Sequence, residues 1–558
     1  MTAASTEAMR RPKVVNISNR LSESAGHYPD KQAVVWPVGK HPDGRIRYAH
    51  VTFRELEAGV NAYARGLAEA GITRGMRTIL MVRPGREFFA LTFALFRIGA
   101  VPVLVDPGMG RRSLIACLAE VEAEAFVGIP LAHVARTIWR SAFRSVRIKV
   151  TVGRRWFWGG RTLKSIRRDG AAFESAKTSA DDLAAILFTS GSTGPAKGAC
   201  YTHGIFDAQV AYLNSAYGYS PEEVDLATFP LFALFDAALG MTAVIPEMNP
   251  SRPADALPEN IIDAVMQHNV SHLFGSPALL DRLGRYGEKH AVRLETIKRV
   301  ITAGAPIPPA VLERVRRMLG DEADVFTPYG ATESLPVSSI ESREILGETA
   351  EKTLAGRGIC VGKPLDGIEA RVIRINDEPI AEWSESLCVA TNQIGEIVIK
   401  GPVVSQSYYR RPDATALAKI RDGDVVRHRM GDVGYLDEHG RIWFCGRKAH
   451  RVEAEQGTLF TIPCEAIFNQ HENVRRSALV GIGPRGRQRP VLFVELESTA
   501  RNADREGLTM ALLALGAAHE HTRSIQTVLY HSGFPVDVRH NAKINRERLA
   551  EWATELLA

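Results

Sequence analysis

The residues best suited to chemistry stand together in one stretch that follows an apolar run. The run is Ala184–Phe188, and the letters TSGSTGPAKG follow it. Glycines let backbone N–H groups converge on an anion, hydroxyls add donors, and a lysine supplies a mobile positive charge. The stretch predicts a phosphate-binding loop, although it lacks the GxxxxGK[ST] spacing of a Walker A loop, and a solvated surface loop is the alternative. The residues expected to bind phosphate are Thr189, Ser190, Gly191, Ser192, Thr193, Gly194 and Lys197.

An aromatic ring, a hydroxyl and a carboxylate occur within five positions in Tyr329–Glu333, YGATE. An aromatic ring can stack on a base, a threonine can bond a phosphate, and a carboxylate can hold Mg²⁺. Taken alone, so short a motif is more often a turn with a solvated glutamate.

Two single residues add to this inventory. Asp432 follows a glycine, and a carboxylate fixed in a turn can accept hydrogen bonds from two ribose hydroxyls, although an Asx-turn residue is an equal alternative. Lys543 stands in RHNAKIN near the C-terminus, where a lone lysine is usually a solvated surface charge.

Several other chemistries are excluded by what the sequence lacks. No GxSxG nucleophile elbow and no HExxH pair occur, so hydrolase and metalloprotease functions are disfavoured. The six cysteines are scattered and form no CxxC pair, which favours a reducing compartment. No secretory signal and no clean apolar span are found, and we expect a cytoplasmic protein.

Together these motifs resemble the adenylate-forming superfamily of acyl-CoA synthetases, peptide-synthetase adenylation domains and luciferases. Further matches follow in the superfamily's order over about residues 50–550: AGAP at 303–306, GEIVIKGP at 395–402, Gly431-Asp432 and Gly446-Arg447. The resemblance implies ATP and Mg²⁺ as cofactors. It implies that Tyr329 and Gly330 contact adenine, Thr332 phosphate, Glu333 the metal, and Asp432 and Arg447 the ribose. It also implies that Gly304 and Ala305 contact the nucleotide, that Gly304 lines the substrate pocket as well, and that Lys543 neutralises charge that develops at the α-phosphate.

At positions that serve the second step of the superfamily's reaction, this sequence departs from the usual residues. Thioester-forming members carry an Asp or Lys two residues after the hinge arginine, where this chain has Ala449, and Glu453 replaces a frequent lysine. In the PLFAL segment Ala233 replaces the usual gating His or aromatic residue. With Phe232 and Phe235 we expect Ala233 to line the substrate pocket, and plain core packing is the alternative.

The segments FPLFALFDAALG, YGATE and FPVDVRHNAKI look like those of the β-lactone synthetases of bacterial long-chain olefin biosynthesis. This resemblance implies that a long-chain 2-alkyl-3-hydroxy acid is adenylated and that its own β-hydroxyl closes a lactone. His203 is a candidate for the hydroxyl proton, and a packed histidine at a helix start is the alternative. A long-chain fatty acid–CoA or fatty acid–AMP ligase is the competing function, and a silent nucleotide-binding scaffold is disfavoured because Lys197, Glu333 and Lys543 are present.

These residues need a scaffold of strands alternating with helices. Residues 53–67 repeat apolar positions at helical spacing, and TILMV at 78–82 is a buried-strand run. The alternation recurs at 182–213, 262–280 and 297–319, which predicts an α/β fold with mostly parallel sheets. We expect a large adenylation domain over 1–447, with a β-rich subdomain at about 360–447. A mobile α+β domain is expected over 448–558.

The net charge of +6 has a local origin. Residues 136–168 hold 11 Lys or Arg and no acidic residue, so the rest of the chain carries −5. Three of the seven tryptophans, Trp139, Trp156 and Trp158, lie in the same segment. We expect no nucleic-acid partner. Basic residues mixed with aromatic ones predict a peripheral membrane contact or an acidic partner, such as an enzyme of the same pathway, and a solvated loop is the alternative.

Overall fold

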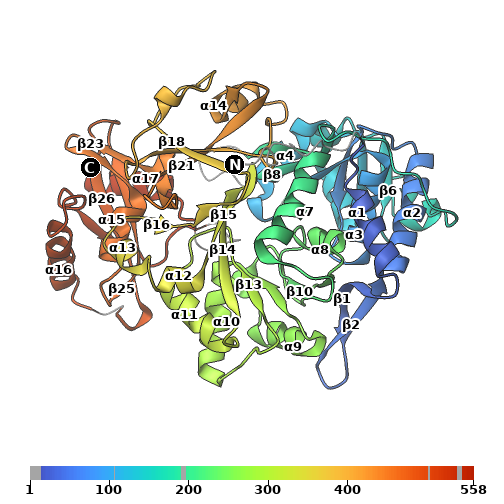
Figure 1. Cartoon of the computed structure of the whole chain (residues 1–558), viewed down its shortest axis with the longest axis horizontal. Helices are drawn as coiled ribbons and strands as arrows, with labels where there is room; N and C mark the ends of the chain where they lie inside the picture. The colour runs from blue at the N-terminus through green and yellow to red at the C-terminus, as the bar shows by residue number, and fades with distance from the viewer. Residues whose placement is uncertain (1–13, 106, 190–195, 501–502, 537–542) are drawn as a thin grey trace, which may run out of the picture.

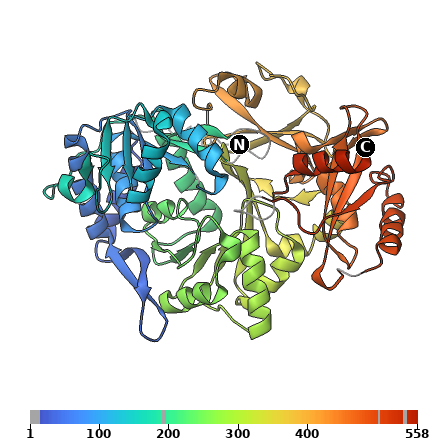
Figure 2. The ribbon, with the colours of Figure 1, turned by 180° about the vertical axis from the view of Figure 1, so that it is seen from behind.

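The computed structural model describes residues 14–105, 107–189, 196–500, 503–536 and 543–558. In Figure 1 the N-terminal elements, in blue, and the C-terminal elements, in orange and red, lie at opposite ends of the molecule. The green and yellow elements lie between them, and Figure 2 shows the same order from behind. The α/β class with mostly parallel sheets that the sequence predicts is confirmed.

The first sheet has seven strands, which are parallel except at the β8–β9 edge. Its strands are, in spatial order, β7 (Arg161–Thr162), β6 (Ile148–Thr151), β5 (Ala125–Gly128), β3 (Arg77–Met81), β4 (Val101–Val105), β8 (Leu183–Thr189) and β9 (Lys197–Thr202). The helices of this part of the chain are α1 (Ser18–His27), α2 (Phe53–Glu69), α3 (Arg86–Ile98), α4 (Arg111–Val121), α5 (Pro130–Ile138), α6 (Leu163–Ile166) and α7 (His203–Tyr217).

Helix α2 shows how the local sequence builds this part. Thr52 caps the helix, and its backbone N–H donates to Glu55 Oε2 over 2.8 Å, so that orphan donors of the first turn are satisfied. The apolar residues at helical spacing, from Phe53 to Leu67, are buried as predicted. The face they form packs on α3, whose side chains are almost all buried.

The second sheet has nine strands and carries most of the site. In spatial order they are β17 (Lys363–Pro364), β15 (Ser334–Glu341), β14 (Asp324–Ala331), β13 (Arg299–Ile301), β12 (His272–Phe274), β10 (Val224–Ala227), β11 (Thr242–Val244), β1 (Gln32–Lys40) and β2 (Ile46–Thr52). The six strands from β14 to β1 are parallel. The associated helices are α8 (Ala233–Leu239), α9 (Pro258–His268), α10 (Pro277–His290), α11 (Pro309–Met318), α12 (Ser342–Leu346) and α13 (Ala350–Leu354).

A third sheet is antiparallel and corresponds to the β-rich stretch that the sequence predicts. It contains β16 (Ile359–Cys360), β22 (Ile442–Arg447), β21 (Val425–Leu436), β19 (Gly395–Lys400) and β18 (Glu369–Ile373), with β20 (Lys419–Asp422) paired to β21 and α14 (Pro412–Ala418) beside it.

The elements after Arg447 form sheets of their own. They are β23 (Val452–Ala454), β24 (Gly457–Leu459), α15 (Thr461–Phe468), β25 (Val474–Ile482), β26 (Arg489–Leu496), α16 (Arg505–Ala517), β27 (Val528–Tyr530) and α17 (Arg546–Leu557). Across the described residues, no helix is long and apolar enough to cross a membrane.

Candidate active site

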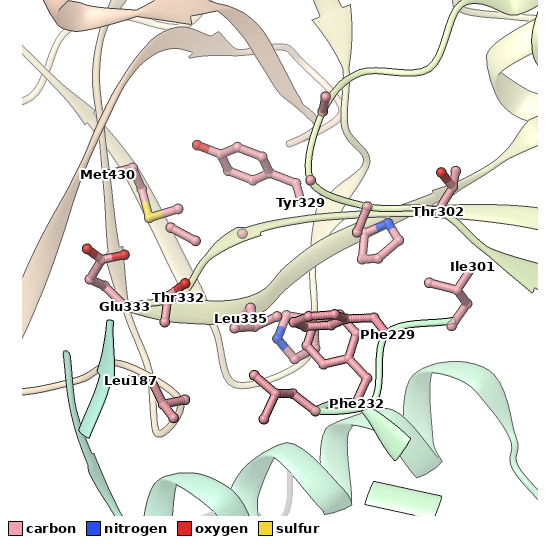
Figure 3. Close-up of a pocket in the computed structure, with 18 of the residues that line it drawn as sticks. Leu187, Phe229, Phe232, Ile301, Thr302, Tyr329, Thr332, Glu333, Leu335 and Met430 are labelled. Atoms are coloured by element: carbon pink, nitrogen blue, oxygen red, sulfur yellow. The ribbon is translucent and has the colours of Figure 1, made fainter. Parts of the chain in front are cut away.

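One cavity of about 730 Å³ collects most of the residues that the sequence singles out. Loops that follow the parallel strands β10, β12 and β13 supply part of its lining, including Phe229, Ser276 and Gly304. The carboxyl ends of parallel strands open at one edge of a sheet, which is where α/β proteins bind ligands. In Figure 3, Glu333 and Met430 lie on the side of the cavity opposite Ile301 and Thr302.

The charged wall of the cavity consists of Tyr329, Glu333, Asp432 and Arg447. The Tyr329 hydroxyl donates to Asp432 Oδ2 over 2.7 Å, and Arg447 Nη1 lies 2.9 Å from Asp432 Oδ1. Burial raises the pKa of Asp432, whereas Arg447 and the Tyr329 hydroxyl oppose that rise. The strand register of β21 and β22 places Asp432 opposite Arg447, so the carboxylate lies on a strand rather than in the turn expected from the sequence.

Glu333 forms the second half of the charged wall. The Tyr408 hydroxyl donates to Glu333 Oε1 over 2.6 Å, and Lys197 Nζ lies 5.2 Å from the Tyr408 ring centroid. Lys197 begins β9, so it stands on a strand rather than within the expected loop. Mg²⁺ is commonly held by one or two carboxylates together with substrate phosphates. Glu333 fits that role, and the described residues contain no group of three or more His, Cys, Asp or Glu that could hold a metal alone.

The YGATE motif folds as a tight connection between β14 and β15. A Cβ on Gly330 would lie 2.7 Å from the Ser334 carbonyl oxygen, so this close approach of two strands requires glycine. Thr332 is held from the other side, because the Tyr201 hydroxyl donates to its carbonyl oxygen. The turn therefore fixes Thr332 and Glu333 at the cavity edge.

The apolar wall consists of Phe229, Phe232, Phe274 and Ile301. The Phe232 ring centroid lies 4.9 Å from that of Phe229 and 4.8 Å from that of Phe274, with edge-to-face geometry. Phe235 and Gly304 also line the cavity. Gly304 has a φ of 97°, a conformation that side chains other than glycine rarely adopt. The charged and apolar walls thus line the same cavity, which suits an acid that carries an alkyl chain.

Comparisons with known proteins identify the family of this chain. The family model described as "AMP-binding enzyme" matches residues 21–409. The chain belongs to the AMP-binding enzyme family. It is 50% identical over 554 residues to an olefin beta-lactone synthetase of Xanthomonas campestris pv. campestris, covering 98% of this chain and 99% of that protein. The resemblance stated from the motifs is therefore confirmed.

Two solved structures show the same fold at lower identity. The amide bond synthetase McbA from Marinactinospora thermotolerans superposes with a TM-score of 0.78 at 22% identity, over 96% of this chain and 99% of its own. O-succinylbenzoate coenzyme A synthetase from Bacillus subtilis, in complex with ATP and magnesium ion, gives 0.73 at 19% identity, over 95% and 99% of the two chains.

Several residues expected from the family motifs are brought together in the cavity. Its lining includes Lys197, Gly304, Ala305, Tyr329, Gly330, Thr332, Glu333, Asp432, Arg447 and Lys543. Lys543 comes from the far end of the chain, and its charge opposes the rise that burial causes in the pKa of Asp432. Five expected phosphate-loop residues, Ser190, Gly191, Ser192, Thr193 and Gly194, lie outside the described residues, as does the side chain of Thr189.

Two expected residues are placed elsewhere. His203 is fully buried, accepts a hydrogen bond at Nδ1 from the Ile17 N–H over 3.2 Å, and is not among the described residues that line the cavity. Burial lowers its pKa to about 4. Ala233 begins α8, is fully buried in the core and is likewise not among the described residues that line the cavity. In both cases the structure favours the packing alternative that the sequence left open.

Sequence reasoning missed Lys419, which stands behind the charged wall. Its Nζ donates to Ser405 Oγ over 3.2 Å and lies 6.0 Å from the Tyr408 ring centroid. Burial lowers the pKa of Lys419 to about 7, although Glu333 acts against that shift. In the sequence ALAKI, this lysine gives no sign that it is buried.

Proposed function

We propose that this chain activates a long-chain 2-alkyl-3-hydroxy acid with ATP and closes it to a β-lactone, releasing pyrophosphate and AMP. The observation that carries the proposal is the 50% identity, over nearly the whole chain, to an olefin beta-lactone synthetase. The cavity supports it, because a charged wall suited to a nucleotide faces an apolar wall suited to an alkyl chain.

In the first step a carboxylate oxygen of the acid attacks the α-phosphorus of ATP, and the bond to pyrophosphate breaks. Asp432 would hold the ribose hydroxyls, kept in place by Arg447 and Tyr329. Lys543 would offset the negative charge that grows at the α-phosphate. Mg²⁺, when bound at Glu333, would supply positive charge to the phosphate oxygens.

In the second step the 3-hydroxyl oxygen attacks the activated carbonyl carbon, the bond to AMP breaks, and the hydroxyl proton is released. The apolar wall would hold the chain so that hydroxyl and carbonyl lie in near-attack geometry. The buried position of His203 removes support for its role as the base, and we assign that role to no side chain.

We also propose that residues 448–558 act as a unit that carries Lys543 to and from the charged wall. Lys543, Ile544 and Arg546 contribute to the cavity lining together with Arg447, the residue at the expected hinge. In this proposal residues before and after Arg447 come together over ATP and close the cleft.

The test is product identification with and without coenzyme A. The protein is incubated with ATP, Mg²⁺ and a synthetic 2-alkyl-3-hydroxy acid, and the products are identified by mass spectrometry. We expect lactone and AMP in both reactions. A thioester, or turnover only after coenzyme A is added, would instead establish the competing acyl-CoA ligase function.

We propose that residues 136–168 make a peripheral contact with a membrane and that their partner is an anionic lipid surface. The Trp158 ring stacks on His133 at 5.3 Å and its Nε1 donates to Thr151 Oγ1 over 2.9 Å, which anchors the loop. Trp156 and Phe157 project from it, 54% and 77% exposed. Of the basic side chains in this segment, only Arg167 and Arg168 form ion pairs in the described part of the chain.

Vesicle co-sedimentation tests this contact. We expect binding to phosphatidylserine-containing vesicles but not to pure phosphatidylcholine, and a loss of about ten-fold or more in Arg154→Ser/Arg155→Ser, since each basic residue near such a surface contributes about 1 kcal/mol. Trp156→Ser/Phe157→Ser should weaken binding as well. Absence of sedimentation by the unmodified protein would overturn the proposal and leave an acidic protein, such as an enzyme that supplies the acid or consumes the lactone, as the partner class.

A further inference from the structure

The cavity changes character at its inner end. The parallel register puts Ala227 beside Phe274, and Asp225 beside His272 two residues earlier along the same strands. At about 3.3 Å per residue, the second pair lies roughly 7 Å deeper, away from the carboxyl ends of the strands. Asp236 of α8 joins them, and all three polar side chains line the cavity. We name Asp225, Asp236 and His272 the polar floor.

The polar floor is buried and incompletely hydrogen-bonded. Asp225 is 3% and Asp236 7% exposed, and the two carboxyls are hydrogen-bonded to each other, which requires a shared proton. His272 Nε2 lies 3.1 Å from the Tyr219 hydroxyl and 3.4 Å from Asp225 Oδ1. Beyond the shared proton, Asp225 Oδ1, Asp236 Oδ2 and His272 Nδ1 have no hydrogen-bond partner among the described residues.

The charges around the polar floor do not neutralise it as an ordinary ion pair would. Glu223, two residues before Asp225 in the chain, is held by Arg299 Nη1 at 2.7 Å. Lys31 acts on Asp236 through its charge, while its Nζ donates to the Gly240 carbonyl oxygen over 2.7 Å. The carboxyl pair therefore has no direct cationic partner within the described structure and faces the cavity instead.

An alkyl chain and this floor are poorly matched. The apolar wall can cover methylene groups without loss, because its atoms need no hydrogen bonds. A chain long enough to reach the polar floor would displace water from unpartnered oxygen and nitrogen atoms and offer nothing in return. Each further methylene that contacts the polar floor therefore lacks the favourable free energy of transfer from water that an apolar tunnel would give it.

We propose that Asp225, Asp236 and His272 set the upper limit on the chain length of the acid. The alkyl arm that enters this end of the cavity is accepted as far as the row of Ala227 and Phe274, and longer arms are rejected at the polar floor. This role determines specificity, and none of the three residues takes part in the chemical steps. The inference rests on the proposed function only in that the ligand is an acid with an alkyl arm.

The test measures pyrophosphate release with two homologous series of 2-alkyl-3-hydroxy acids, one lengthened at each alkyl arm. With the unmodified protein, we expect kcat/KM to fall by about ten-fold or more beyond a limiting length in one series. In Asp225→Val/Asp236→Leu the fall should move to longer acids. In the matched control Asp225→Asn/Asp236→Asn, which keeps the floor polar, the limit should stay. Asp236→Leu alone serves if the double variant does not fold, and retained turnover of the shortest acids verifies folding.

Two results would overturn the proposal. One is an active apolar variant with an unchanged length limit, and the other is an equal shift of the limit in the Asn variant. Mass spectrometry on the same samples judges the proposed function separately, because pyrophosphate release without lactone would refute lactone formation and still report the length limit.

Discussion

Two buried aspartates line the same cavity and stand in opposite electrostatic settings. Asp432, in the charged wall, receives a hydrogen bond from Tyr329 and an ion pair from Arg447. Asp225, in the polar floor, faces a second carboxyl, Asp236. Burial raises the pKa of both, but at Asp432 the guanidinium opposes the rise, whereas burial takes the pKa of Asp225 to about 7.

The partner of a buried carboxyl, and not its residue type, decides what the group can do. A carboxylate kept charged beside a cation is suited to hold polar groups of a nucleotide. A carboxyl pair that shares one proton carries one negative charge instead of two and acts as a polar surface. The charged wall is therefore the end where substitutions should abolish chemistry, and the polar floor the end where they should change selectivity.

The largest loss of activity is expected when the positive charge of Lys543, which the C-terminal residues bring to the charged wall, is removed. We expect Lys543→Ala to lower kcat for pyrophosphate release by about 10²- to 10³-fold, because a charge aimed at the developing phosphate anion is lost. Lys164→Ala, which removes an exposed lysine, is the matched control and should leave kcat unchanged. Ordinary turnover by the Lys543→Ala variant would remove Lys543 from the mechanism.

Disruption of the ion pair in the charged wall should rank second. Asp432→Ala removes the proposed ribose acceptor and leaves Arg447 without its partner, and we expect KM for ATP to rise by about 10- to 100-fold, as for the loss of charged hydrogen bonds. Asp225→Asn is the matched change at the polar floor and should leave KM for ATP unaltered. Steady-state kinetics with ATP as the varied substrate decide this, and equal effects at both aspartates would erase the comparison.

The sequence predicts the charged wall better than the polar floor, for a physical reason. Hydroxyls, glycines and a lysine directly after an apolar strand are an unusual combination, so residues such as Lys197 and Glu333 stand out within short motifs. Asp225 and Asp236 stand in VDLA and LFDAA, which look like an ordinary strand and helix. Only the packing of α8 against β10 joins the two carboxyls, and no local pattern encodes that contact.

In the fold as well, local sequence patterns predict some features, and tertiary packing alone determines others. Helix α2 follows from apolar spacing and its Thr52 cap, and the parallel sheets follow from the alternation of strands and helices. Ala233 could line a pocket or fill a core, because a small residue suits both, and tertiary packing placed it in the core. Helix α17 was not identified from the sequence, although RERLAEWATELL carries a helical apolar pattern.

The polar floor should make the stability of the protein depend on pH. The raised pKa of Asp225 means that the folded protein binds more protons than the unfolded chain between about pH 4 and pH 7. The stabilisation that this extra proton binding adds to the free energy of unfolding is thus fully present below pH 4 and is lost as the pH rises through 7. Glu223 strengthens the trend, and Lys31 opposes it. His272 stays neutral throughout, because burial lowers its pKa to about 3.

Urea unfolding of the unmodified protein and of Asp225→Asn/Asp236→Asn across this pH range gives the readout. We expect the difference in unfolding free energy between the two proteins to change in favour of the double variant as the pH rises from 4 to 7. A difference that does not vary with pH would mean that the carboxyl pair does not share a proton.

The smallest effect is expected between the two ends, at Thr302. Its Oγ1 is buried at the cavity and has no hydrogen-bond partner among the described residues, so it resembles the polar floor rather than the charged wall. Thr302→Val removes this hydroxyl and keeps the shape of the side chain. The free energy of unfolding should therefore stay within about 1 kcal/mol of the unmodified value, because no hydrogen bond is broken. Urea unfolding measures this, with Thr228→Val as the control, since the Thr228 hydroxyl donates to the Phe274 carbonyl oxygen over 2.6 Å. A greater loss in Thr302→Val than in the control would show that water satisfies Thr302 and that the polar character of the floor extends this far toward the charged wall.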